Sequence, residues 1–284
     1  MIPAAFDYYA PTSVDEAVAL LGEHEDAKVM AGGQSLLPVL RLRLAAPETI
    51  IDLGRIEELR GIREDGDALV IGAMTPHSVV QSDPLVAEHA RLISLATATI
   101  ADPQVRHRGT FGGSLVHADP AGDLPAVAVA LGAFFVIAGA TGRRTVAAAD
   151  FFEGVFSTVV GEDELLVEVR VPKHTGWGAH YEKFTRIAQQ WSIVAVAAAV
   201  RLDGGTIAEA RVALTNMGST PVRATAVEQA LVGQPASADA VREAAARAAD
   251  GTSPPSDLNG DADYRRHLAT VLTRRAVLAA AGTG

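Results

Sequence analysis

The chain has 284 residues, of which 49% are hydrophobic and 20% are charged, and its net charge at pH 7 is −10. This composition is typical of a globular protein with a substantial core, and an acidic chain has no electrostatic attraction for nucleic acids or anionic lipids. The absence of cysteine excludes disulfides, a thiol nucleophile and any cysteine-ligated zinc or iron–sulfur cluster within this chain. We expect a cytoplasmic protein, because we find neither a signal-peptide pattern nor an apolar run of the ~20 residues that a membrane helix needs.

The first 53 residues predict a compact α/β unit. Apolar residues recur at helical spacing behind Ser13 and Glu16, which form a capping-box pattern, and they predict a helix over about 14–22. The elements that follow are predicted in the order strand, helix, strand, at 28–31, 36–44 and 49–53.

A second unit of alternating strands and helices is predicted up to Pro172. Between two of its helices lies a glycine-rich stretch, 109–122, without a clear helix or strand pattern, and such long connections are often functional. The predicted elements are strands at 69–71, 134–137 and 165–171 and helices at 92–100 and 124–131.

The pattern changes after a short linker at 173–178. Three strands in succession are predicted, the last two joined by a hairpin turn at 203–205, and helices come last. We therefore expect an α+β fold with a separate C-terminal domain at about 177–282, built on a three-stranded antiparallel sheet. Its predicted strands are 180–186, 192–202 and 206–215, and its predicted helices are 223–232, 238–249 and 264–281.

Two glycine-rich segments carry the chemistry that the sequence suggests. In the first, Gly32 and Gly33 follow a strand and precede a helix, where exposed main-chain N–H groups can bind an anion. The second, at 109–122, again combines paired glycines with hydroxyl residues and adds Asp119 and Asp123, whose carboxylates can accept hydrogen bonds from sugar hydroxyls. Either segment alone is more often a tight turn, but together they favour one ligand with two phosphates.

Other functional motifs are missing from the sequence. Neither glycine-rich segment has the G-x-G-x-x-G spacing, no P-loop occurs, and the histidines show no metal-binding spacing. A dinucleotide would therefore have to be bound by another fold. Only His117, which lies within the second segment, remains a candidate among the histidines.

Several stretches, in order along nearly the whole chain, resemble the flavoprotein (medium) subunit of the carbon monoxide dehydrogenase and xanthine dehydrogenase family. They are AGGQSLLP at 31–38, IADPQVRHRGTFGGSLVHADPAGDLPA at 100–126, ELLVEVRVP at 164–172, YEKFTRIAQQWSIVAVAAAV at 181–200, ALTNMGSTPVRA at 213–224 and ADYRRHLATVLTRRAV at 262–277. The resemblance implies an FAD-binding domain of the vanillyl-alcohol-oxidase or p-cresol-methylhydroxylase type over 1–173, with subdomains at about 1–53 and 54–173.

The resemblance also implies which residues hold FAD. In the family both glycine-rich segments embrace the pyrophosphate, and an acidic residue matched by Asp123 lies near the ribityl and phosphate part. Leu166 and Lys183 match positions close to the isoalloxazine ring, and Trp191 falls where carbon monoxide dehydrogenases place a tyrosine. The segment residues carried over are Lys28, Val29, Met30, Ala31, Gly32, Gly33, Gln34, Ser35, Leu36, Thr110, Phe111, Gly113, Ser114, His117 and Ala118.

Two positions depart from the carbon monoxide dehydrogenase pattern, which usually has His in place of Gln34 and an aliphatic residue in place of Phe111. Backbone-mediated phosphate binding should tolerate both changes. The substrate class stays open among carbon monoxide, aldehydes and purines or other N-heterocycles, since the flavin subunit does not touch the substrate.

Three functions are compatible with the residues. The resemblance implies an electron-transfer subunit that needs no catalytic acid or base and binds no metal: FAD here takes electrons from two [2Fe–2S] clusters in a small subunit, while substrate is oxidised at molybdopterin in a large subunit. A dimer of such heterotrimers is expected. The alternatives are a self-contained flavin oxidoreductase, which would need its own substrate pocket, and a non-enzymatic scaffold, which would not need intact glycine segments.

Overall fold

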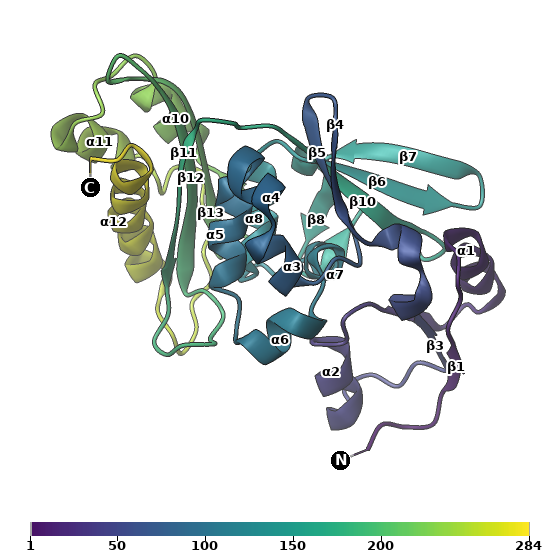
Figure 1. Ribbon diagram of the computed structural model, residues 1–284. Coiled ribbons are helices and arrows are strands. Elements are labelled where there is room, and N and C mark those ends of the chain that lie inside the picture. The colour runs from purple at the N-terminus through teal and green to yellow at the C-terminus, as the bar shows by residue number, and fades with distance from the viewer. Residues whose placement is uncertain (1, 284) are drawn as a thin grey trace.

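The computed structural model describes residues 2–283, so the first residue of the predicted 1–173 domain lies outside it. The chain begins with a parallel sheet in the order β1-β3-β2, here called the N-terminal sheet (Figure 1). Helix α1 begins as predicted, because the Ser13 side chain accepts the N–H of Glu16 at 3.2 Å. The elements are β1 (Asp7–Tyr9), α1 (Val14–Glu23), β2 (Ala27–Met30), α2 (Leu36–Leu42) and β3 (Thr49–Asp52), followed by 3₁₀ turns at Leu53–Arg55 and Glu57–Leu59.

A five-stranded antiparallel sheet in the order β4-β5-β10-β6-β7, the central sheet, follows. The sequence predicted its three inner strands but not β4 and β7, whose exposed, polar residues lack an apolar pattern. The strands are β4 (Ile62–Asp65), β5 (Ala68–Gly72), β6 (Phe134–Gly139), β7 (Gly142–Ala147) and β10 (Leu165–Pro172), with a small separate hairpin of β8 (Phe152–Gly154) and β9 (Ser157–Thr158).

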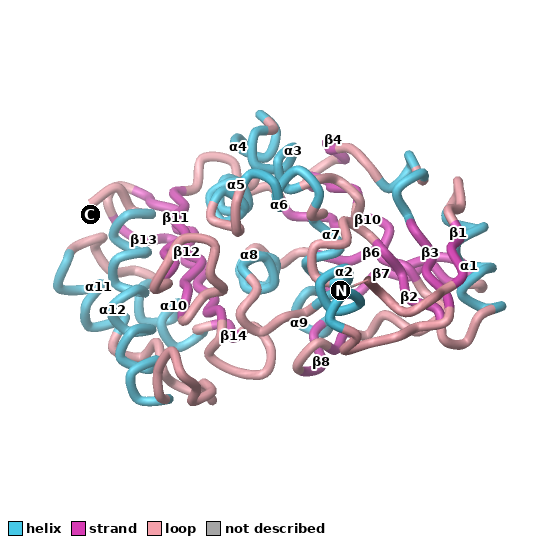
Figure 2. The backbone as a smooth tube through the Cα atoms, turned by 90° about the horizontal axis from the view of Figure 1, so that it is seen from below, coloured by secondary structure: helices cyan, strands magenta, loops and turns pink. Residues whose placement is uncertain are grey.

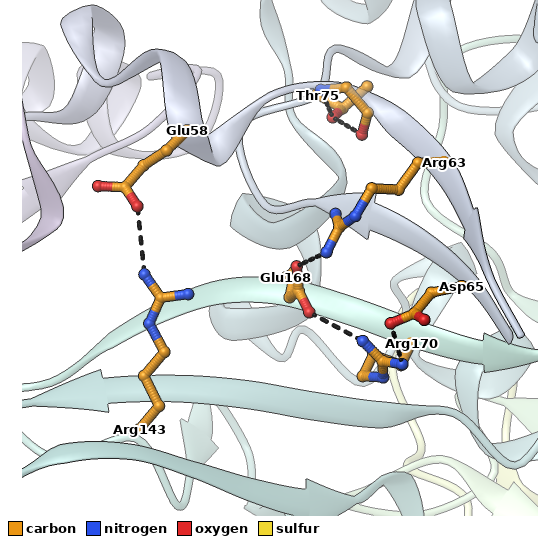
Figure 3. Close-up of polar contacts among 8 residues, drawn as sticks. Glu58, Arg63, Asp65, Thr75, Arg143, Glu168 and Arg170 are labelled. Carbon is orange, nitrogen blue, oxygen red and sulfur yellow. Dashed lines mark hydrogen bonds and ion pairs between the residues drawn. The ribbon is translucent and has the colours of Figure 1, made fainter.

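Ion pairs link strands on one face of the central sheet, and one of them joins the sheet to the turn before β4 (Figure 3). Glu168 of β10 accepts a hydrogen bond from Arg63 of β4 at 2.8 Å, and Arg170 donates to Asp65 at 2.7 Å. Arg143 of β7 reaches Glu58 at 3.2 Å. At least one partner of each pair is about half exposed, so water and salt screen these pairs and each contributes little to stability.

Helices fill the space between the central sheet and the C-terminal part of the chain (Figure 2). Every residue of α8 is buried, as expected for a helix whose residues after Asp123 are apolar all round. It packs against β12 and β13 on one side and against α5 and α7 on the other. The helices of this layer are α3 (His77–Ser82), α4 (Pro84–His89), α5 (Arg91–Ala98), α6 (Pro103–Arg108), α7 (Phe111–His117), α8 (Asp123–Ala130) and α9 (Ala148–Phe151).

The C-terminal sheet has the order β11-β12-β13-β14 and is antiparallel throughout. The prediction of three strands is therefore wrong by one: a two-residue strand, too short to give a periodic pattern, pairs with β13. The strands are β11 (Gly178–Phe184), β12 (Val194–Asp203), β13 (Thr206–Thr215) and β14 (Val222–Arg223), and the helices are α10 (Thr225–Leu231), α11 (Ala238–Ala245) and α12 (Ala262–Ala280).

Strand β12 is buried on both faces, and its side chains alternate between two cores. Small residues at alternate positions, Ala195, Ala197 and Ala199, join the core with α5 and α8. The intervening Val194, Val196, Ala198 and Val200 join the core with α12, which covers the outer face of the sheet (Figure 1). The alanine face lets α8 approach the sheet closely, and this approach places the start of α8 beside β11.

Within residues 2–283, no helix is long and apolar enough to cross a membrane.

Candidate cofactor site

The two glycine-rich segments lie in direct contact. A Cβ built on Gly32 would lie 2.1 Å from the carbonyl oxygen of Arg108 and 2.7 Å from Cα of Gly109. A Cβ on Gly113 would lie 3.1 Å from Cβ of Ala31. No side chain fits between the segments at these points, so the glycines allow two main chains, more than 70 residues apart in sequence, to touch.

The first segment provides main-chain donors that have no partner. Across residues 2–283, nothing accepts a hydrogen bond from the N–H groups at 32–36, although the following turns of α2 are normally bonded. Gly33 adopts a φ of +73°, which side chains other than glycine rarely adopt. Successive unpaired N–H groups in such a turn form a concave site for an anion.

The second segment is not the irregular loop that the sequence predicted at 109–122, because Phe111–His117 forms α7. Thr110 caps this helix and accepts the N–H of Gly113 at 3.2 Å. Its glycines and its one aromatic residue obscured the helical pattern in the sequence.

Most main-chain N–H groups at the start of α7 are already used. Those of Phe111 and Gly112 donate to Thr75 and Ala73, at 2.9 and 2.8 Å, and so hold α7 against the end of β5. At the start of this helix, the N–H of Thr110 has no acceptor among the described residues. The second segment therefore offers this N–H and the hydroxyl groups of Thr110 and Ser114, while the first offers a row of amides.

A cavity of about 580 Å³ opens between the two segments, which is within the range of small-molecule and cofactor sites. Residues from the N-terminal, central and C-terminal sheets and from the helices between them line it. The predicted site residues that line it are Val29, Ala31, Gly32, Gly33, Gln34, Ser35, Leu36, Thr110, Gly113, Ser114, His117, Asp123, Leu166, Lys183 and Trp191.

Four residues that the sequence assigned to the site do not line the cavity. The Phe111 ring is 2% exposed and packs in the core between the central sheet and the helices. Ala118 is also buried and ends α7 in a left-handed conformation. Lys28 and Met30 belong to β2, and Lys28 is exposed.

Charged groups that line the cavity are paired. Lys183 donates to Asp123 at 2.7 Å, and their side chains are only 9% and 3% exposed. Glu164 accepts two hydrogen bonds from Arg144, and this pairing lowers the pKa of Glu164. In the described chain, no cation without a carboxylate partner lines the cavity, so a phosphate there would be bound by neutral donors.

Two histidines at the cavity are held neutral. Burial lowers the pKa of His77 to about 4, and the positive charge of Arg106 adds to this effect. Burial also lowers the pKa of His117. Nδ1 of His77 is buried without a hydrogen-bond partner among the described residues, and its backbone N–H donates to Gly109 at 2.9 Å.

Sequence reasoning missed several residues of the cavity. His77 and Ala73 follow β5 and lie beneath the second segment, Leu165 starts β10, and Glu164 immediately precedes it. None of them belongs to a glycine-rich pattern. Gln189 and Gln190 could have been found, because they immediately precede Trp191.

Comparison with known proteins agrees with this geometry. Residues 4–174 match the FAD binding domain in molybdopterin dehydrogenase, and residues 179–280 match the CO dehydrogenase flavoprotein C-terminal domain. The carbon monoxide dehydrogenase medium chain of Hydrogenophaga pseudoflava is 46% identical over 284 residues, which cover 99% of this chain and 98% of that protein. The chain belongs to the family of FAD-binding medium subunits of molybdenum hydroxylases.

Further relatives show how broad this family is. The nicotine 6-hydroxylase medium subunit of Paenarthrobacter nicotinovorans is 37% identical, with 97% of each chain covered. The solved carbon monoxide dehydrogenase of H. pseudoflava that lacks the Mo-pyranopterin moiety superimposes with a TM-score of 0.96 and 48% identity, over 100% of this chain and 99% of that one. Full-length sequence similarity thus extends to medium subunits named for different substrates.

The residues present fit the FAD that this family binds. A diphosphate needs several donors at short range, and the unpaired amides at 32–36, the N–H of Thr110 and the hydroxyl groups beside it provide them. The largely apolar remainder of the lining, including Val39, Leu53 and Leu166, suits aromatic rings.

Proposed function

We propose that this medium subunit transfers electrons: it accepts them from [2Fe–2S] clusters of a small partner subunit and passes them to an external acceptor, while substrate is oxidised at molybdopterin in a large subunit. The observation that carries this proposal is the pairing of an FAD cavity with the complete absence of cysteine from the chain. Clusters held by cysteine thiolates must then lie in another chain.

Each part of the chain has a role in this proposal. The main-chain amides at 32–36 and the start of α7 hold the FAD diphosphate, and Leu166, Lys183 and Trp191 lie toward the flavin ring. When bound, FAD can take up electrons singly and release them singly or in pairs. The protein orients it and excludes water, and it needs no residue that transfers a substrate proton.

The division of the chain belongs to the same proposal. Residues 1–173 form the FAD-binding domain, with subdomains at 1–53 and 54–173, and residues 177–282 form the C-terminal domain. The sheet boundaries support this division, because the central sheet ends at Pro172 and the C-terminal sheet starts at Gly178. A dimer of heterotrimers in the cytoplasm is the predicted assembly.

Reduction of the flavin tests this function. The chain is produced with FAD, alone and together with its small and large partner subunits, and the visible absorbance of the flavin is followed. Bleaching by carbon monoxide, aldehydes or N-heterocycles is expected only for the complete complex. Bleaching of the isolated chain by such a substrate would instead identify a self-contained oxidoreductase.

A further inference from the structure

Asp123 is the first residue of α8, and its side chain is only 3% exposed. One oxygen accepts hydrogen bonds from the hydroxyl groups of Tyr181 and Ser192, at 2.7 and 2.8 Å. The other accepts from the ammonium group of Lys183 at 2.7 Å. All three donors lie on or next to β11 and β12, so this carboxylate joins the helical layer to the C-terminal sheet.

Two of these donors flank one connecting segment, 185–191, here called the β11–β12 segment. Lys183 is the last residue but one of β11, and Ser192 immediately follows the segment, before β12. Asp123 therefore binds both ends of the segment at once. The last part of the segment, Gln189 to Trp191, lines the FAD cavity.

The middle of the β11–β12 segment has few other supports. Gln190 donates to the side chain of Asn259 at 3.2 Å and accepts from the N–H of Arg186 at 3.1 Å. Ile187 is 69% exposed, and Trp191 is 51% exposed. A segment with so few buried contacts is held mainly where its ends are held.

We propose that Asp123 is a positioning residue for FAD: its carboxylate anchors both ends of the β11–β12 segment and so keeps Gln189, Gln190 and Trp191 over the cofactor cavity. This inference rests on the cavity being the FAD site and assigns Asp123 a task other than direct contact with FAD. Losing the carboxylate removes one side-chain anchor at each end of the segment. The main-chain bond from Ile193 to Phe184, at 2.9 Å, and the bonds from Asn216 to the carbonyl groups of Ser192 and Ile193 remain, so the segment loosens over the cavity without leaving the sheet.

Tyr181 provides an internal control for this proposal. Its hydroxyl group also donates to Asp123, but Tyr181 lies within β11 and is not next to the segment. Burial and the neighbouring carboxylate raise the pKa of this phenol, so it stays a donor at physiological pH. Tyr181→Phe removes one hydrogen bond from Asp123 and leaves both anchors of the segment in place.

Trypsin tests the position of the segment, because Arg186 is an exposed cleavage site within it. Cleavage after Arg186 is measured on the full-length chain without FAD, and FAD dissociation is measured separately. In Asp123→Asn one of the two accepting oxygens becomes an NH2 donor and the negative charge opposite Lys183 is lost, so the side chain can no longer accept from Lys183 and Ser192 on separate oxygens. We expect cleavage to accelerate roughly tenfold or more, because cleavage follows the population of the open segment. FAD dissociation should accelerate in parallel.

Two single-anchor variants and two controls complete the experiment. Ser192→Ala and Lys183→Met each release one end of the segment. Each should increase the rates of cleavage and of FAD dissociation, but by less than Asp123→Asn does. These two variants provide the test if Asp123→Asn does not fold. Tyr181→Phe should stay close to wild type. So should Glu228→Gln, a buried carboxylate that bonds within the C-terminal part of the chain and lies away from the cavity.

Distinct results would overturn the proposal. Unchanged cleavage at Arg186 in folded Asp123→Asn would show that the carboxylate does not anchor the segment. Faster FAD loss with unchanged cleavage would show that Asp123 acts on the cofactor directly. Equal acceleration in Tyr181→Phe would show general destabilisation. Cleavage of the chain without FAD keeps this test independent of whether the cavity binds flavin.

Discussion

Gly32→Ala should abolish tight FAD binding by forcing the two glycine-rich segments apart. The added Cβ would lie 2.1 Å from the carbonyl oxygen of Arg108 and 2.7 Å from Cα of Gly109, whereas ordinary contact begins at 3.4 Å. Both obstacles are main-chain atoms, so no side-chain rotation relieves the clash. The segments must separate by about 1 Å to accept the methyl group.

The cost to binding follows from the donors that this separation displaces. The amides at 32–36 and the donors at Thr110 sit on opposite sides of the contact, and both sets must reach one diphosphate. A hydrogen bond to a charged group contributes about 1.5–3 kcal/mol. Losing two of them weakens FAD binding by about 3–6 kcal/mol, which is roughly a hundredfold to ten-thousandfold in Kd.

Quenching of flavin fluorescence measures FAD binding to the apoprotein and checks this expectation. Thermal unfolding without FAD shows whether the variant is folded. Gly22→Ala is the matched control: Gly22 lies in α1 with no atom within 4 Å of an added Cβ, so alanine there should stabilise the chain by about 0.5–1 kcal/mol and leave FAD affinity unchanged. A folded Gly32→Ala protein that retains wild-type FAD affinity would refute the assignment of the diphosphate to these segments.

Three further predictions concern charge, pH and packing. Because paired charges and neutral donors line the cavity, FAD affinity should change by less than about threefold between roughly 50 and 500 mM salt. A steep loss of FAD affinity with rising salt in binding titrations would contradict binding of the diphosphate by neutral donors. His77 has a folded pKa of about 4, below its usual 6.5, so the unfolded chain binds the proton more readily. The free energy of unfolding should therefore fall by on the order of 3 kcal/mol as pH falls from 6.5 through 4. Denaturant titrations at several pH values should show a weaker pH dependence of this free energy in His77→Gln. The control His267→Gln, at an exposed position, should keep the wild-type dependence. Ala197→Leu should cost about 1–3 kcal/mol in urea unfolding, because α8 packs on that face of β12, and a neutral result would contradict the close approach.

Periodicity predicted those buried elements that have a regular apolar pattern of their own. Helix α1 and strand β12 were found within one or two residues of their observed ends, because α1 keeps a regular apolar stripe and β12 is a continuous apolar run. The contact between the glycine-rich segments was expected from chemistry, since two anion-binding stretches favour one ligand with two phosphates.

What the sequence could not provide depends on contacts between distant residues. Helix α7 was missed because its stability comes from bonds to Ala73 and Thr75 and from packing of Phe111, none of which affects local spacing. Asp123 was expected beside FAD, but its bonds to Lys183 and Ser192 appear only when β11 and β12 pack against α8. Strand β14 depends in the same way on its pairing with β13.

The charges in the cavity favour electron transfer over chemistry on a substrate. An oxidoreductase that handles its own substrate needs a group free to accept or donate a proton near neutral pH. Here Lys183 is committed to Asp123, and Glu164 to Arg144, at hydrogen-bond distances. His77 is neutral with a pKa of about 4 and is therefore a weak base at neutral pH. His117, which also lines the cavity, pairs with no carboxylate among the described residues, so the commitment of Lys183 and Glu164 and the low pKa of His77 leave it as the residue to test for any proton transfer by this subunit.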